Sequence, residues 1–275
     1  PPPKPYGPTP SPRQLRWHRY EFYGFLHFTV NTFTDKEWGY GDESPEVFAP
    51  TAFDADQIVQ TAVEGGMAGL ILTCKHHDGF CLWPSRYTEH SVKHSPWRNG
   101  QGDVVREIAD ACRSHRIGFG VYLSPWDRHH AAYGRPEYLS YYRNQLEELT
   151  TEYGDLFEVW FDGANGEDGY YGGACEFREI DRRSYYDWPT TWEIVRRHQP
   201  EAVMFSDAGP DVRWVGNEQG IAGDPCWSTL AAASLYPGFG GDNWRTESET
   251  DMVKAWASAN DMLNQGDRDG DTWLP

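Results

Sequence analysis

The apolar run that ends in Asp162 is the strongest candidate for chemistry in this sequence. Residues 158–164 read Glu-Val-Trp-Phe-Asp-Gly-Ala, so one carboxylate follows bulky residues and precedes a glycine. Such a run predicts a buried strand, and a charge at the end of a buried strand is costly unless it is paired or used. Asp162 could also cap the next helix or close a turn. It is therefore a candidate active-site carboxylate.

A second carboxylate, Glu218, lies in a glycine-flanked segment further along the chain. Residues 211–220 read Asp-Val-Arg-Trp-Val-Gly-Asn-Glu-Gln-Gly, which permits a tight, exposed turn around Glu218. Glu218 could be a general acid whose pKa is raised by an apolar wall of Trp214 and Trp227, or a solvent-facing loop residue. Retaining glycoside hydrolysis requires two carboxyl groups in one pocket, one ionised and one protonated. Asp162 and Glu218 could form that pair.

Two adjacent histidines, His76 and His77, form the next candidate motif in the segment Lys-His-His-Asp-Gly-Phe at residues 75–80. In a tight loop both rings can reach one pocket. They could be metal ligands, which would need a third ligand, or structural polar residues at the rim of a barrel. The carboxylates and aromatic residues around them favour a third interpretation, in which they donate hydrogen bonds to a polyhydroxylated ligand.

A carboxylate and an indole stand side by side at Glu37 and Trp38, before Gly39 and Tyr40. Such a pair can hold a sugar, because the carboxylate accepts from hydroxyl groups while the indole stacks on the apolar face of the ring. A packed surface loop explains the same residues equally well when they are taken alone.

Composition narrows the classes of function. The chain has 275 residues and a formal net charge of −18, with 24 Lys and Arg against 42 Asp and Glu. This balance argues against a nucleic-acid partner and against an anionic membrane surface. No apolar run approaches the roughly 20 residues of a transmembrane helix. The 13 Trp and 16 Tyr suit carbohydrate binding as well as an aromatic core, and the five Cys lack the C-x-x-C spacing of a zinc site.

The residues above must be positioned by strands that alternate with helices. The pattern predicts strands at residues 22–28, 68–73, 119–123, 157–161, 202–206 and 212–215, and helices that begin near residues 54, 103, 136 and 188. This alternation implies a parallel sheet with right-handed crossovers. Polar residues follow nearly every strand, which favours a (β/α)8 TIM-like barrel over a doubly wound sheet. No phosphate-binding glycine motif supports nucleotide binding.

The motifs, taken in order, resemble those of the α-L-fucosidases of glycoside hydrolase family 29. They are F-x-H-F, E-W-G, K-H-H-D-G-F, Y-x-S, V-W-F-D-G-A and R-W-V-G-N-E-x-G, and the match runs from about Phe22 to Thr229. The last motif is similar to the branch that is selective for α-1,3/1,4-linked fucose on branched oligosaccharides.

This resemblance implies a retaining exo-α-L-fucosidase that acts on fucosylated, Lewis-type oligosaccharides. Asp162 would be the nucleophile and Glu218 the acid/base. The fucose pocket would be lined by His27, Glu37, Trp38, His76, His77, Tyr122 and Trp160, with Arg213 and Trp214 near the acid/base. No cofactor and no metal ligand is implied. We expect a secreted or periplasmic location, although the start of the chain has no signal-peptide pattern.

We expect two segments, an extended Pro-rich lead-in at residues 1–16 and a catalytic barrel domain at residues 17–275. The family pattern continues beyond Trp273-Leu274-Pro275, and residues 230–272 show one helix-like stretch, 249–264. We therefore expect the barrel in this chain to lack about two strands, and we expect a homo-oligomer or a companion C-terminal segment. A non-catalytic fucose-binding protein on a truncated scaffold is the alternative, and a metal-dependent hydrolase is a third interpretation.

Overall fold

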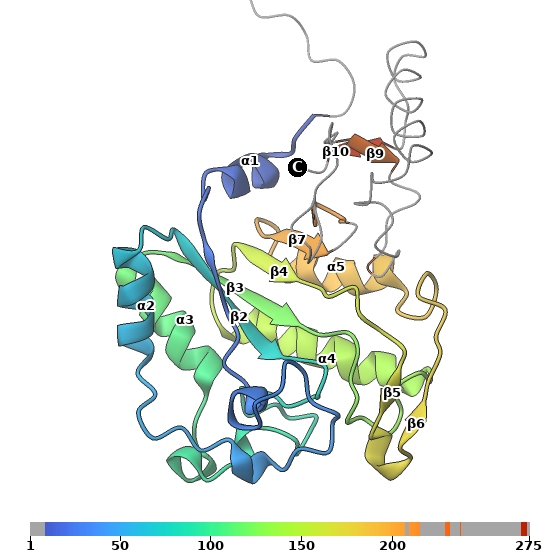
Figure 1. The fold of residues 1–275 in the computed structure, drawn as a ribbon. Helices are drawn as coiled ribbons and strands as arrows, with labels where there is room; N and C mark the ends of the chain where they lie inside the picture. The colour runs from blue at the N-terminus through green and yellow to red at the C-terminus, as the bar shows by residue number, and fades with distance from the viewer. Residues whose placement is uncertain (1–8, 207–208, 215–228, 232–236, 238–270, 274–275) are drawn as a thin grey trace, which may run out of the picture.

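The computed structural model describes residues 9–206, 209–214, 229–231, 237 and 271–273, and its centre is a parallel sheet of six strands (Figure 1). In sheet order these are β1 (Gly24–Leu26), β2 (Gly69–Lys75), β3 (Gly118–Leu123), β4 (Glu158–Trp160), β7 (Val203–Ser206) and β8 (Val212–Arg213). Each strand pairs in parallel with the next one of this series along the chain. This is the strand order of a (β/α)8 barrel, of which the described residues supply six strands. The predicted α/β class with a parallel sheet is confirmed.

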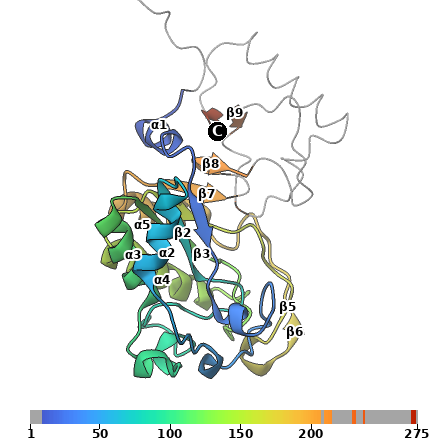
Figure 2. The ribbon, with the colours of Figure 1, turned by 60° about the vertical axis from the view of Figure 1, so that its left-hand side comes forward.

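Helices α2 to α5 cover one face of this sheet (Figures 1 and 2). They are α2 (Ala55–Glu64), α3 (Val104–His115), α4 (Glu137–Glu152) and α5 (Trp188–His198). All four begin where the sequence predicted. Aspartates cap two of them: Asp54 accepts from the Gln57 N–H at 3.0 Å, and Asp103 accepts from the Arg106 N–H at 2.8 Å. Every residue of β2 is buried, as expected of a strand covered on both faces.

The lead-in is not extended throughout, which corrects one prediction. Helix α1 (Pro12–His18) begins at Ser11, whose side chain accepts from the Gln14 N–H while the Gln14 side chain accepts from the Ser11 N–H. This capping box, with proline at the first helical position, is a helix-start signal. The prediction of an extended segment rested on the high proline content and did not take this signal into account. Gln14 also donates to the Asp211 carbonyl at 2.7 Å, which ties α1 to the segment before β8. Residues 1–8 lie outside the described residues.

Several short elements were not predicted. They are the antiparallel hairpin β5 (Asp168–Gly169) and β6 (Glu176–Phe177), the antiparallel pair β9 (Thr229–Ala231) and β10 (Asp271–Trp273), and the 3-10 turns η1 (Val30–Phe33), η2 (Pro45–Val47), η3 (Val92–His94), η4 (Trp97–Gly100) and η5 (Tyr171–Gly173). Strands of two or three residues carry too little periodicity to be seen in a sequence. The predicted helix 249–264 lies outside the described residues. None of the described helices is long and apolar enough to cross a membrane.

A buried carboxyl group, that of Glu158, lies at the beginning of β4. Its side chain accepts a hydrogen bond from the Trp17 indole N–H at 2.7 Å, and burial raises its pKa to about 8. In the unfolded chain this group ionises near its ordinary pKa of about 4.3. Between these two values the folded state holds a proton that the unfolded state has released. Stability therefore falls as the pH rises from about 4 to 8.

Replacing Glu158 with Gln should remove this pH-dependent loss of stability. The amide oxygen can still accept from Trp17, so the Glu158→Gln protein should gain more thermal stability at pH 8 than at pH 5. The difference in the free energy of unfolding should be of the order of 3 kcal/mol. Thermal denaturation at both pH values measures it, with the exposed Glu137→Gln as a control. An equal gain at both pH values would contradict a raised pKa.

Candidate active site

Asp162 lies just beyond the C-terminal end of β4, with both of its carboxylate oxygens held by hydrogen-bond donors. The Tyr122 hydroxyl donates to Oδ2 at 2.8 Å, and the backbone N–H of Ala164 donates to Oδ1 at 2.6 Å. Tyr122 reaches Asp162 because β3 and β4 pair with Tyr122 opposite Trp160. Burial and the nearby Asp162 charge raise the pKa of Tyr122 well above its ordinary value, so this hydroxyl keeps its proton. The carboxylate is thus fixed in one orientation.

A cavity of about 400 Å³ opens over Asp162 at the carboxyl ends of the strands, a volume within the range of small-ligand pockets. It contains every predicted site residue that the structure describes except Arg213. The lining consists of Phe25, His27, Glu37, Trp38, His76, His77, Tyr122, Trp160, Asp162, Ala164 and Trp214. The structure therefore brings together side chains from residue 25 to residue 214, and it adds Phe25 and Ala164 to the predicted set.

The histidines of this cavity are neutral at pH 7. Burial lowers the pKa of His27, lowers that of His76 well below its ordinary value, and lowers that of His77 to about 3. The nearby Asp162 charge opposes the change at His27 and His76 but does not overcome it. Neutral imidazoles have one donor and one acceptor nitrogen each, which suits hydrogen bonding to hydroxyl groups.

The direction of the hydrogen bond at His77 follows from its partner, Ser124. The Ser124 hydroxyl donates its single proton to the Trp126 carbonyl at 2.6 Å, so it must accept from Nδ1 of His77, which lies 2.7 Å away. Nε2 of His77 is then an acceptor. We predicted that His77 donates to a ligand, whereas this network makes it accept from a ligand hydroxyl.

Two indoles supply apolar faces to the cavity. The Trp160 ring stacks on Phe205 with centroids 4.7 Å apart and lies 6.3 Å from that of Trp214. On the other side Trp38 packs edge-on against His77 and Trp126 at 5.3 and 5.4 Å. Trp38 and Trp214 remain 37% and 38% exposed, so both can contact a ligand.

The rest of the Lys-His-His-Asp motif is structural. Lys75 is fully buried and pairs with Asp127 at 3.1 Å while it donates to Gln145 at 3.0 Å. Asp78 accepts from the Phe80 N–H at 2.7 Å and from the Asn31 amide at 2.8 Å, and burial raises its pKa to about 7. These buried contacts fix the turn that carries the two histidines.

Arg128 supports the site, although it belongs to none of the motifs that indicated a site residue. This buried side chain donates to the Gly39 carbonyl at 2.7 Å and to the carbonyl and carboxylate of Asp168, both at 2.9 Å. Its guanidinium group also lies over the Trp126 ring, 5.0 Å from the centroid. It therefore joins the loop that carries Trp38 to the β5–β6 hairpin. Its position directly after Trp126-Asp127, in a loop that follows a strand, was the signal available in the sequence.

The structure does not bring Arg213 into the observed cavity. Arg213 is buried in β8 and does not line it, whereas Trp214, the next residue, does. Glu218 lies outside the described residues. Within the part of the chain that the structure describes, no group of three or more His, Cys, Asp or Glu side chains is placed to hold a metal ion.

Comparison with known proteins identifies the family. The family model described as alpha-L-fucosidase matches residues 9–223, which is most of the chain. The chain belongs to the α-L-fucosidase family. It is 52% identical to alpha-L-fucosidase 1 of Arabidopsis thaliana over 229 residues, which are 83% of this chain and 43% of that protein.

Solved structures of the family agree with this fold. A glycoside hydrolase 29 family member from an unknown rumen bacterium is 54% identical with a TM-score of 0.81, over 88% of this chain and 45% of that one. A Ruminococcus gnavus GH29 fucosidase in complex with fucose is 35% identical with a TM-score of 0.67, over 82% of this chain and 50% of that one. The chain spans less than half the length of the Arabidopsis relative.

Replacing Arg128 with Lys should weaken the binding of a fucosylated substrate more than it slows the hydrolysis of that substrate. Arg128 reaches its three acceptors on Gly39 and Asp168 from three different nitrogens of one planar group. A lysine ammonium is a single point donor without this fork, so the Trp38 loop should loosen. We expect KM to rise about tenfold with a smaller change in kcat. Steady-state kinetics measures KM and kcat. The control is Arg143→Lys in α4, which also loses several hydrogen bonds, in this case to residues at the start of α5 and just before it. If the Arg128→Lys protein has an unchanged KM and a lower Tm, Arg128 stabilises the fold and does not contribute to substrate binding.

Proposed function

We propose that this chain carries the active site of a retaining exo-α-L-fucosidase that removes terminal α-1,3/1,4-linked L-fucose from fucosylated oligosaccharides. The observation that carries the proposal is the oriented Asp162 carboxylate in a cavity lined by neutral histidines and exposed indoles. Membership of the α-L-fucosidase family supports it, as does the fucose complex of the Ruminococcus gnavus relative. The R-W-V-G-N-E-x-G segment is the basis for the linkage preference.

In the first step, Asp162 attacks the anomeric carbon of fucose while Glu218 gives its proton to the departing glycosidic oxygen. The carbon–oxygen bond to the aglycone breaks as the ester to Asp162 forms. In the second step Glu218 takes a proton from water, the hydroxide attacks the anomeric carbon, and free fucose leaves. The attack of the hydroxide breaks the ester bond between fucose and Asp162 and regenerates the carboxylate. The Ala164 N–H and the Tyr122 hydroxyl orient this carboxylate before the first step and again after the second.

Recognition of the sugar would rest on the histidines and indoles. Nε2 of His77 accepts from one fucose hydroxyl. Nδ1 of His76 is buried and has no hydrogen-bond partner among the described residues, so a bound hydroxyl or water would satisfy it. Trp160 and Trp38 offer apolar faces for the ring carbons.

The stereochemistry of the first product tests the mechanism. Retention requires that α-L-fucose forms first and the β anomer appears only by later mutarotation, which proton NMR follows directly. Initial β-L-fucose would refute retention. Comparing a Lewis-type trisaccharide with an aryl fucoside tests the linkage preference, since we expect the trisaccharide to be hydrolysed with the higher kcat/KM. Fucose binding without hydrolysis of either substrate would favour the non-catalytic alternative.

The assembly and the location remain predictions. A homo-oligomer or a companion C-terminal segment is testable by measuring the mass in solution and by comparing activity with that of a C-terminally extended chain. A secreted or periplasmic location is testable by fractionation of the source cells.

A further inference from the structure

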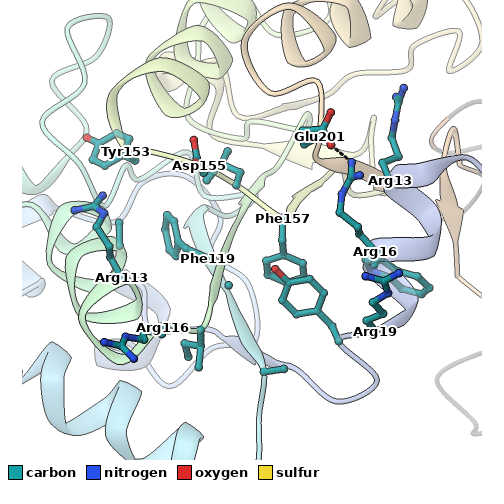
Figure 3. A pocket seen from close by; sticks show the side chains of 17 residues that line it. Arg13, Arg16, Arg19, Arg113, Arg116, Phe119, Tyr153, Asp155, Phe157 and Glu201 are labelled. Atoms are coloured by element: carbon teal, nitrogen blue, oxygen red, sulfur yellow. Dashed lines mark ion pairs between the residues drawn. The ribbon is translucent and has the colours of Figure 1, made fainter.

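A second cavity lies at the opposite end of the strands from Asp162. Its volume is about 730 Å³, against about 400 Å³ for the cavity over Asp162. Ala68, which precedes β2, Gly118, which begins β3, and Phe157, which precedes β4, lie at its floor. Helix α1 forms one wall and the C-terminal end of α3 the other (Figure 3). No part of the proposed mechanism uses this cavity.

The walls of this cavity are strongly basic although the whole chain has a net charge of −18. Five arginines line it: Arg13, Arg16 and Arg19 from the α1 side, and Arg113 and Arg116 from the α3 side (Figure 3). Two carboxylates line it as well, Asp155 and Glu201, and Glu201 pairs with Arg16. The formal charge of the lining is therefore +3, from five positive and two negative groups. Such a local excess attracts anions against the field of the rest of the protein.

Part of this positive charge is not neutralised by carboxylates. Within the described residues, neither Arg19 nor Arg116 forms a salt bridge, and both are exposed. Arg116 also has a left-handed backbone conformation, with φ of 60° at the C-terminus of α3. Glycine and asparagine are favoured at such positions, so an arginine there is held at a cost to the backbone. Because both guanidinium groups are exposed and form no salt bridge within the described residues, both are open to a ligand.

The floor between the two basic walls is aromatic. Tyr20 stacks on Phe157 with centroids 4.4 Å apart and ring planes at 22°. Tyr20 fits there because Gly118 has no side chain: a Cβ on Gly118 would lie 2.5 Å from the Tyr20 ring. Phe119 lies between the walls as well (Figure 3). An apolar floor and a volume in the range of organic-ligand pockets fit a ligand larger than a bare inorganic ion.

We propose that this cavity binds a phosphate or sulfate ester carried on an apolar ring. The ring lies against Tyr20, Phe157 and Phe119, and the ester oxygens accept hydrogen bonds from both Arg19 and Arg116. Guanidinium groups match the geometry of such oxygens with two parallel donors. Because this site and the Asp162 cavity lie at opposite ends of the strands, the two should bind independently.

Calorimetric titration at constant ionic strength tests this site with phenyl phosphate, phenyl sulfate, inorganic phosphate and phenol as probes. We expect one equivalent of phenyl phosphate or phenyl sulfate to bind, and their relative affinities identify the preferred ester. Inorganic phosphate should bind at least about tenfold more weakly, because it lacks the apolar ring. Phenol should not bind measurably, because it lacks the charged ester oxygens. L-Fucose should not compete.

Matched arginine variants test whether the ester binds in this cavity. Arg19→Gln and Arg116→Gln should each weaken phenyl phosphate binding about tenfold, while Arg116→Lys should retain part of the affinity. Arg182→Gln removes the same charge from an exposed loop outside the cavity and should change nothing. Affinity that is unaffected by both pocket variants, competition by L-fucose, or equal binding of inorganic phosphate would each overturn the proposal. Thermal melts of the exposed variants confirm that they fold.

Discussion

Replacing Asp162 with Asn is expected to lower kcat on a fucosylated substrate about 1,000-fold or more, because an amide cannot form the glycosyl ester. The shape of the site should survive the change. The Asn carbonyl oxygen can still accept from the Ala164 N–H, and its amide can donate to the Tyr122 hydroxyl, which now lie 2.6 and 2.8 Å from the carboxylate. Binding of L-fucose should therefore stay within a few-fold of wild type.

Turnover and binding must be measured separately on the Asp162→Asn protein, by steady-state kinetics and by calorimetric titration with L-fucose. Asp110→Asn is the matched control, since Asp110 is an exposed carboxylate on α3, paired with Arg113 outside the active-site cavity. If Asp162→Asn keeps even a tenth of wild-type kcat, Asp162 is not the nucleophile. If L-fucose binding is lost as well, the carboxylate serves in recognition more than in chemistry.

Replacing His77 with Ala should lower kcat/KM about 100-fold. The change removes the acceptor for one sugar hydroxyl and leaves that hydroxyl unpaired in a largely buried cavity, which costs more than the bond alone. Ser124→Ala should have a smaller effect, because it removes only the group that sets the orientation and tautomer of His77. Because the pKa of His77 is lowered to about 3, its protonation should not reduce activity between pH 7 and pH 5.

Kinetics of the wild-type protein and both variants across this pH range tests whether His77 is neutral. A fall in the activity of the wild-type protein that follows an ordinary histidine pKa, and that disappears in the His77→Ala protein, would contradict a neutral acceptor. Treatment with EDTA should leave activity unchanged. Stoichiometric zinc that is lost together with activity would instead support the metal-dependent interpretation of the histidines.

Much of the architecture could be predicted because its determinants are local. Asp54 and Asp103 cap the helices that follow them, and the apolar runs before Lys75 and Asp162 form buried strands. Residues that follow strands in a parallel sheet meet at one edge, so the cavity over Asp162 contains nine of the eleven residues named from the sequence. Of the other two, Glu218 lies outside the described residues and Arg213 is buried in β8.

The sequence by itself determined which residues could do chemistry and at which end of the sheet they lie, since caps, strand ends and motif order depend on neighbours in the chain. Only the tertiary structure decided how they act. The Ser124 hydroxyl makes His77 an acceptor, and Arg128 joins the Trp38 loop to the β5–β6 hairpin. The tertiary structure also places the arginines of α1 and α3 around one aromatic floor. The side chains involved lie about 40 to 100 positions apart in the chain, and only the packing of the parallel sheet and its helices sets the distances between them.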